Sequence, residues 1–183
     1  ALEAEFPVAA NRALQRIRAV FNWGLERDLV KTNPTLGLKK PTKEKPRSRT
    51  LSDEELAAVW KACNVLGYPA QQFMRILILT GQRRDDVRHM HWSELDLDSG
   101  DWTIPAERYK SDRPHLIPLT SVMVKMLHDM PFRDRAGYVF SPSGGVKPYG
   151  NVVRPKATLD IASGVTGWTL HDFRRTLRTG LSR

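Results

Sequence analysis

The chain has 183 residues, of which 40% are hydrophobic and 8% aromatic, so it can form one ordinary domain and part of a second. A large multidomain enzyme is excluded, and so is a transmembrane helix, because no apolar run approaches the roughly 18 residues that such a helix needs. Lys and Arg number 29 against 20 Asp and Glu, and the resulting charge of +9 favours a polyanionic partner such as nucleic acid or an acidic membrane.

Near the N-terminus, hydrophobic residues recur at three- and four-residue steps and predict an amphipathic helix that ends near Asp28. Its apolar stripe consists of Leu14, Ile17, Phe21 and Leu25. Periodicity then disappears, and prolines among many cations predict an extended basic linker over residues 32–50. The cations of this linker are Lys39, Lys40, Lys43, Lys45, Arg47 and Arg49. Either they contact the phosphate backbone of DNA, or they only keep a connecting segment solvated.

A second unit is predicted to begin at residue 51, where Ser52 and Glu55 form a capping box at the start of a helix. A strongly apolar helix follows from Phe73 to Leu79. Gly81 interrupts it, and the charged stretch QRRDDVRHM then resumes helical spacing.

The hydrophobic period then changes from that of helices to that of strands. Short apolar runs at residues 95–97, 102–104 and 116–119 predict three antiparallel strands. Helices are expected again at 121–130 and at 151–162, the latter with Pro155 in its first turn. We therefore predict a mainly helical α+β fold with a small three-stranded antiparallel sheet.

The last predicted helix is capped by Thr169. Its apolar stripe consists of Leu170, Phe173, Leu177 and Leu181. His171 and Arg174 are three residues apart, so they lie together with Arg178 on a second face of this helix. This face is either a site formed by His171 and Arg174 or a solvated polar surface.

Two further cations are candidates for chemistry. Arg83 follows an apolar helix, where an unpaired guanidinium is costly and an anion is needed. Asp86, three residues on, is one such anion, and a phosphate bound bidentately is the other. Lys110 lies in the turn between two predicted strands, where a lysine often only increases solubility.

A metal site is not predicted. Cys63 is the only cysteine, which excludes a thiolate zinc cage and fits a reducing cytosol. His89 and His91 are two apart on a predicted helix and point to different faces, so surface or capping roles are expected of them.

Three segments in a fixed order resemble a known family. TGQRRDDV, a strand pair joined by ERYKSDRPHLIPL, and TLHDFRRT together resemble the catalytic domain of tyrosine recombinases, the integrases that exchange DNA strands at specific sites. The stretches WTIPAERYKSDRPHLIPL and GWTLHDFRRT are most similar to integrases of prophages and genomic islands. The resemblance implies that 1–31 is the last helix of a helical core-binding domain, 32–50 the linker, and 51–183 a catalytic domain incomplete at its C-terminus.

The resemblance also implies roles for individual residues. Arg83 and Arg174 would clamp the scissile phosphate and stabilise its transition state, with Asp86 supporting Arg83. Lys110 would protonate the departing 5′ oxygen, and His171 would donate to the phosphate or help to move protons. No cofactor and no metal are implied, because these cations supply the positive charge.

The nucleophilic tyrosine of this family follows the final helix, whereas the chain's tyrosines all precede it. Tyr109 is the one that we considered as a substitute, and packing on a neighbouring strand is expected of it instead. We therefore expect the full-length parent to cut and rejoin DNA and this fragment to be inactive. The alternative is a DNA-binding module or regulator without chemistry.

The expected partner is double-stranded DNA that carries an attachment site. Binding to a membrane is not expected. The resemblance implies a homotetramer on DNA for the full-length parent, while the fragment is expected to be a monomer. The expected location is the bacterial cytoplasm, in association with the nucleoid.

Overall fold

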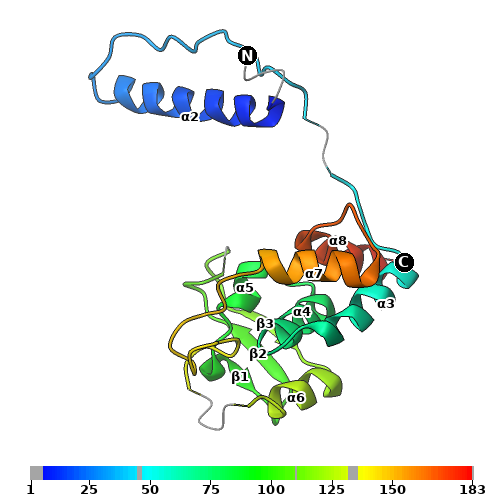
Figure 1. The fold of residues 1–183 in the computed structure, drawn as a ribbon. Coiled ribbons are helices and arrows are strands. Elements are labelled where there is room, and N and C mark those ends of the chain that lie inside the picture. Colours follow the sequence, from blue (N-terminus) through cyan, green and yellow to red (C-terminus); the bar gives the residue numbers. More distant parts are fainter. Residues whose placement is uncertain (1–5, 45–46, 110, 132–135, 183) are drawn as a thin grey trace. The chain divides into compact units, whose positions relative to one another are not determined.

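Figure 1 shows the computed structural model of the chain, which describes residues 6–44, 47–109, 111–131 and 136–182. The chain forms two compact units, Ala1–Arg47 and Ser48–Arg183, which we call the N-terminal and the C-terminal unit. Among the described residues, no helix has both the length and the apolar character needed to cross a membrane.

The N-terminal unit is built on helix α2 (Pro7–Leu25), after which the chain turns and runs back along the helix. Side-chain hydrogen bonds hold this returning segment: Asn33 to Asn22 (2.6 Å), Arg18 to the Leu38 carbonyl (2.7 Å) and Asn11 to the Thr42 carbonyl (2.7 Å). The sequence predicts an extended linker here, but the segment is held against α2 as far as Glu44, whose carboxylate accepts from Asn11 (2.8 Å) and Arg12 (3.2 Å). Periodicity does not reveal such contacts, because single polar side chains make them.

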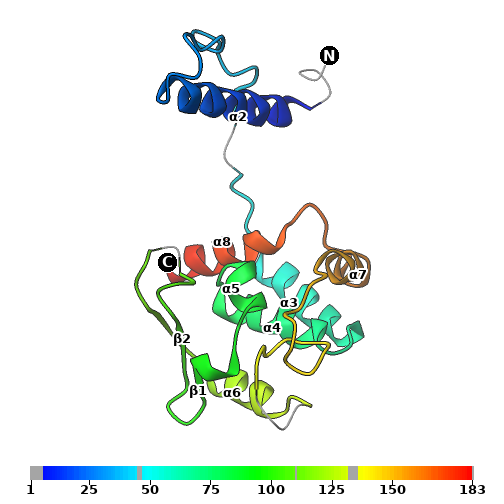
Figure 2. The same cartoon turned by 90° about the vertical axis from the view of Figure 1, so that its left-hand side faces the viewer.

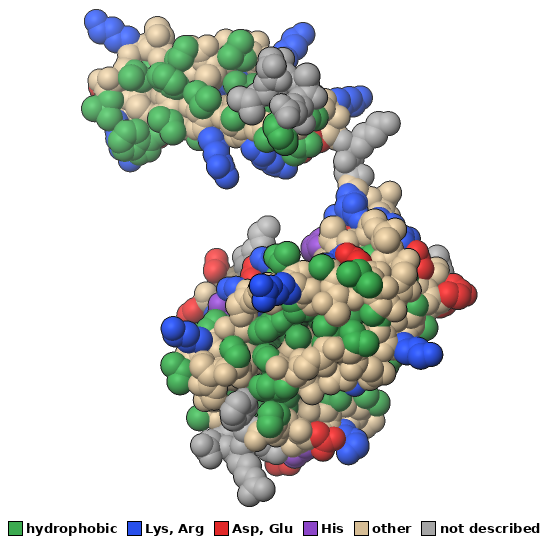
Figure 3. Space-filling view, in the orientation of Figure 1, with side chains coloured by type: hydrophobic (Ala, Val, Ile, Leu, Met, Phe, Trp, Pro, Cys, Tyr) green, Lys and Arg blue, Asp and Glu red, His purple; other side chains and the backbone are tan. Residues whose placement is uncertain are grey.

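The apolar face of α2 is only partly covered by the described residues. Ile17, Val20 and Trp23 are 48%, 65% and 51% exposed, whereas Asn11 and Gly24 are the buried residues of the helix. Figure 3 shows hydrophobic side chains gathered on the surface of this unit. The helix therefore turns a polar residue and a glycine, rather than its largest hydrophobic residues, toward the returning segment.

The described part of the C-terminal unit is mainly helical and contains one small sheet. Its α-helices are α3 (Asp53–Ala62), α4 (Ala70–Thr80), α5 (Arg84–Arg88), α6 (Ser121–His128), α7 (Val153–Ser163) and α8 (Leu170–Leu181). Two 3₁₀ turns, η1 (Cys63–Val65) and η2 (Trp92–Glu94), accompany them. The strands β1 (Leu95–Asp96), β2 (Asp101–Ile104) and β3 (His115–Pro118) pair antiparallel in the order β1-β2-β3. The predicted fold class is confirmed.

The core of this unit surrounds α4. Phe73, Ile76 and Leu77 on this helix are at most 1% exposed, and Trp102 of β2 and Phe173 of α8 belong to the same buried cluster. Figures 1 and 2 both place α6 at the opposite end of the unit from α8. Because α4 is buried on most of its surface, its C-terminal end is held firmly in place.

Local sequence signals locate several element ends correctly. Ser52 and Glu55 form the predicted capping box of α3, and Thr169 forms one with Asp172 at the start of α8. Pro155 lies in the first turn of α7, as predicted. The predicted stripe of α8 is buried at Phe173 but not at its end, because Leu181 is 80% exposed.

Candidate functional site

The site begins where α4 ends. Gly81 ends this helix in the left-handed conformation (φ 56°), and its N–H donates to the Leu77 carbonyl (3.1 Å). A Cβ at this glycine would lie 2.5 Å from Leu177 Cδ2, so α8 packs tightly against the turn. Gln82 and Arg83 follow, and Arg83 stands in extended backbone at the N-cap of α5.

Arg174 of α8 reaches this same turn. Its Nη1 donates to the Gly81 carbonyl (2.9 Å) and to Gln82 Oε1 (3.3 Å). The second predicted arginine is thus hydrogen-bonded to the two residues directly before the first. Arg83 and Arg174, which are far apart in the sequence, are brought together by the packing of α8 on the end of α4.

Arg83 is close to an anion but is not saturated by it. Its Nη1 lies 3.6 Å from Asp86 Oδ2, which is longer than a hydrogen bond. Both atoms are buried and have no hydrogen-bond partner among the described residues. The structural pairing with Asp86 therefore exists, and it leaves donor capacity on the guanidinium for a second anion.

His171 lies in the first turn of α8 and lines a cavity of about 410 Å³ together with Arg83. The other residues around this cavity are Arg84, Asp85, Asp86, Thr169 and Leu170. Desolvation by burial lowers the pKa of His171, and the positive charges of Arg175 and Arg174 lower it further. His171 thus lies close to several positive charges, at the cavity that Arg83 also lines.

Lys110 lies outside the described residues, but its neighbour Tyr109 is described. The Tyr109 ring stacks on His115 of β3, with ring centroids 4.3 Å apart and planes at 12°. Arg83 Cζ lies 5.2 Å from the centroid of the Tyr109 ring. The aromatic packing expected of Tyr109 is confirmed, and it places the β2–β3 hairpin beside Arg83.

His115 is a residue of this region that the sequence did not single out. Desolvation by burial lowers the pKa of His115, the charges of Arg174 and Arg83 lower it further, and Asp86 opposes them. A detectable signal was present, because a histidine stands in β3 two residues before the buried Ile117 and thus on the same face of the strand.

The start of the C-terminal unit is attached to α8 as well. The Leu51 N–H donates to Thr176 Oγ1 (2.9 Å), and that hydroxyl donates to the Asp172 carbonyl one turn earlier (2.8 Å). Asp172 is fully buried, and its carboxylate accepts from Thr169 N (2.8 Å) and from Arg175 (2.6 Å). The helix that carries His171 and Arg174 is therefore fixed at several points along its length.

The predicted basic segment is divided between the two units. Lys39, Lys40 and Lys43 are exposed on the N-terminal unit, as is Arg47 at its end, while Lys45 lies outside the described residues. Arg49 belongs to the C-terminal unit, where it pairs with Glu55 at 2.5 Å and donates to the Thr50 carbonyl. Arg49 is accordingly less available to a polyanion than the exposed lysines.

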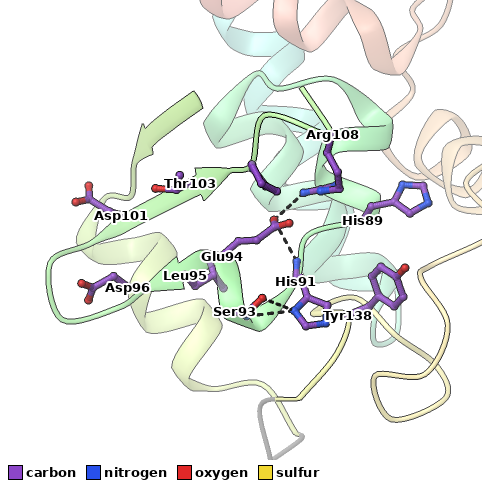
Figure 4. Close-up of a pocket in the computed structure, with 11 residues that line it drawn as sticks. His89, His91, Ser93, Glu94, Leu95, Asp96, Asp101, Thr103, Arg108 and Tyr138 are labelled. Carbon is purple, nitrogen blue, oxygen red and sulfur yellow. Dashed lines mark hydrogen bonds and ion pairs between the residues drawn. The ribbon is translucent and has the colours of Figure 1, made fainter. Parts of the chain in front are cut away.

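A second cavity, of about 680 Å³, is lined by residues of β1, β2 and the segments next to them, and none of the predicted site residues lines it. Figure 4 shows Glu94 in its wall, where the carboxylate accepts from Arg108 (2.6 Å) and from the His91 N–H (3.3 Å). His91 also caps η2, which is the capping role expected of it. Among the described residues, no three His, Cys, Asp or Glu side chains are grouped so that they could hold a metal ion.

Comparison with known proteins places this arrangement in a family. The model of the phage integrase family matches residues 49–183. The prophage integrase IntZ of Escherichia coli (strain K12) is 29% identical over 188 residues, which cover 98% of this chain and 46% of IntZ. Prophage integrase IntF of the same organism is 26% identical, over 70% of this chain and 28% of IntF. The chain thus spans less than half the length of these curated relatives.

Solved structures share the fold. A lambda integrase dimer bound to a COC′ core site has a TM-score of 0.73 at 19% identity, covering 96% of this chain and 52% of that one. A lambda integrase tetramer bound to a Holliday junction gives the same score and identity over 96% and 55%. The family match covers the unit in which the two arginines, the histidine and the hairpin meet, and the chain belongs to the phage integrase family of tyrosine-type site-specific recombinases.

Proposed function

We propose that the full-length protein integrates or excises a prophage or genomic island by site-specific DNA strand exchange, and that this chain supplies its phosphate-binding site. The convergence of Arg83 and Arg174 on one turn carries the proposal, because Arg174 is hydrogen-bonded to the two residues before Arg83 and a pair of arginines suits a phosphodiester. The family match and the DNA-bound lambda integrase structures support the same substrate class.

Each side chain of the site has a task in this chemistry. Arg83 and Arg174 bind the scissile phosphate, and their donors stabilise the extra negative charge of the pentavalent transition state. Lys110 protonates the 5′ oxygen as its bond to phosphorus breaks, and His171 donates to a phosphate oxygen. Asp86 attracts Arg83 from one side and leaves donors of its guanidinium for the substrate.

The nucleophile is proposed to lie outside these residues, so that this chain binds DNA without cleaving it. Tyr149 is only 8% exposed, and the Tyr68 hydroxyl donates to the Val139 carbonyl (3.2 Å). Tyr109 is stacked on His115, and Tyr138 lines the other cavity. These contacts support the view that none of the four attacks phosphorus.

We propose duplex DNA with an attachment site as the partner and a homotetramer on DNA as the assembly of the full-length protein. The lambda integrase tetramer on a Holliday junction supports this assembly. The fragment is proposed to be a monomer, a state that light scattering without DNA tests directly. The exposed lysines of the N-terminal unit would contact the phosphate backbone of the duplex. The proposed location of the full-length protein is the bacterial cytoplasm, in association with the nucleoid.

Binding to duplex DNA tests the phosphate site. Fluorescence anisotropy over a salt series should give a linear dependence of log affinity on log salt, with about −0.9 for each phosphate neutralised. Arg83→Ala and Arg174→Ala should each weaken binding and make the slope shallower, by up to about 0.9. Lys125→Ala, which removes an exposed cation from the distant α6, is the matched control and should have little effect. Equal loss in all three variants would contradict the site.

Cleavage tests the chemistry. A suicide substrate that carries the attachment site should give no covalent protein–DNA product with this chain, whereas the full-length protein should give one. In the full-length protein, Arg83→Ala or Arg174→Ala should lower the cleavage rate by about 100- to 1,000-fold, as for the loss of one transition-state donor. A full-length protein that binds the site but never cleaves it would instead be the non-catalytic DNA-binding module.

A further inference from the structure

Three planar groups lie in series beside the phosphate site. The Arg83 guanidinium lies over the Tyr109 ring at 5.2 Å, and the Tyr109 ring stacks on His115 at 4.3 Å with almost parallel planes. Cation–π contacts of this kind extend to about 6 Å, and offset parallel stacking is a favoured arrangement of aromatic rings. His115 is therefore connected to Arg83 through one intervening ring.

The sheet fixes His115 in this place. It pairs with Ile104 across β2 and β3, and it shares a face of β3 with Ile117, which is 5% exposed. Its ring thus stands at the end of the buried face of the sheet, at the point where the hairpin leaves it. Tyr109 is held within that hairpin, because its N–H donates to the Pro105 and Ala106 carbonyls (both 3.1 Å).

Arg83 needs such a support. Its Nη1 has no hydrogen-bond partner among the described residues, and its distance to Asp86 is 3.6 Å. Ion pairing at this distance attracts the charge but does not fix the plane of the guanidinium. Bidentate binding of a phosphate depends on that plane, so a flat ring beneath the guanidinium restricts it to useful orientations.

The charges around His115 make its protonation depend on the occupancy of the site. Arg174 and Arg83 act on it as positive charges and Asp86 as a negative one, while Tyr109 covers one ring face. With the site empty, partial burial and then the charges of the two arginines disfavour the protonated ring. A phosphodiester bound between the arginines offsets their field and favours the protonated ring.

We propose that His115 is a positioning residue of the phosphate site, which holds Tyr109 under Arg83 and takes up a proton from the solvent when a phosphodiester binds. This inference rests on the proposed function, since it assumes that the two arginines bind a DNA phosphate. It adds a residue of β3 to the site and makes DNA binding more favourable in mildly acidic solution.

Substitutions of His115 separate its two contributions. His115→Ala removes the stacking partner and should weaken binding to a duplex by about 2- to 10-fold, the value of one aromatic pair. His115→Phe keeps a ring that cannot be protonated, so it should bind like the wild type at neutral pH. Between about pH 7.5 and about pH 6, however, it should gain less affinity than the wild type. His128→Ala, on α6, is the matched control and should retain the full gain. His171 is present in all these proteins, so its own titration cancels in the comparison.

A double-mutant cycle tests whether His115 acts through Arg83. The losses of affinity in Arg83→Ala and His115→Ala should not add, because His115 has nothing to position once the guanidinium is gone. Additive losses would overturn the positioning role. Thermal unfolding of each variant shows whether it is folded, and if His115→Ala is not, the comparison of His115→Phe with the wild type still decides the proton uptake.

NMR titration measures the pKa of the His115 ring, which should not change on DNA binding if the role of His115 is purely structural. Its pKa should rise when duplex DNA is added, and it should rise in DNA-free Arg174→Ala, which lacks one positive neighbour. An unchanged pKa in both cases would overturn the inference. The DNA-free measurement tests the inference about His115 without relying on DNA binding. The proposed function has a separate test, because it would be contradicted if Arg83→Ala and Arg174→Ala failed to weaken DNA binding.

Discussion

Replacing Gly81 by alanine tests the turn on which the two arginines meet. The left-handed backbone of this residue costs a residue with a Cβ about 1–2 kcal/mol. The new Cβ would also lie 2.5 Å from Leu177 Cδ2 and 3.1 Å from Leu177 Cβ. Rotation of the leucine can move the first atom but not the second, so overpacking of about 1–3 kcal/mol is added. We expect a total loss of about 2–5 kcal/mol in the free energy of unfolding.

The chain offers a matched control for this variant. Gly164 follows α7 in the same left-handed conformation (φ 69°), but nothing lies within 4 Å of the Cβ that alanine would add. Gly164→Ala should therefore lose only the backbone contribution, about 1–2 kcal/mol. Urea unfolding followed by circular dichroism measures both variants, and an unchanged m-value allows the two midpoints to be compared.

A functional readout accompanies the loss of stability. Because Arg174 donates to the Gly81 carbonyl, displacement of α8 should also weaken DNA binding by the folded Gly81→Ala protein, but not by Gly164→Ala. Adding Leu177→Ala should recover part of both losses, since it removes most of the clashing side chain. Equal destabilisation by the two glycine substitutions would refute the close approach of α8. Unaltered DNA affinity would refute the dependence of the site on it.

Two further predictions concern buried polar groups of the C-terminal unit. Asp172→Ala removes the cap of Thr169 and the partner of Arg175 from a fully buried position, and thermal or urea unfolding should show a loss of about 2–4 kcal/mol. In contrast, Asp129→Ala, whose ion pair is exposed, should change stability by less than about 1 kcal/mol. Burial raises the pKa of the Cys63 thiol to about 11, so the native protein should react with iodoacetamide at neutral pH far more slowly than the urea-unfolded one. Similar native and unfolded rates would show that the thiol is accessible.

Sequence patterns located the elements well because they report which face of an element is buried. The period of α4 and the alternation in β2 are of this kind. The capping box at Ser52 and the cap at Thr169 mark instead where helices begin. Element ends were less accurate: the first helix was expected to end near Asp28 and ends at Leu25. The helix predicted for 121–130 ends at His128.

Contacts made by single side chains were beyond the reach of these patterns. Nothing periodic indicates that Arg174 would donate to the Gly81 carbonyl, or that Asn11 would hold the chain at Thr42. The family resemblance pointed to the arginines, but it gave no reason to select His115. The spacing of His115 from Ile117 indicates only a shared face of the strand, and the register of β2 and β3 is needed to place it near the arginines.

The hydroxyl of Thr176 connects the two ends of the C-terminal unit. It joins the first residues of the C-terminal unit to α8, since Leu51 donates to it and it donates in turn to Asp172. Local opening of the first residues of this unit would therefore leave Thr176 Oγ1 without this donor, on the same helix that bears His171 and Arg174. One hydroxyl group thus connects the stability of the unit's first residues to that of its last helix.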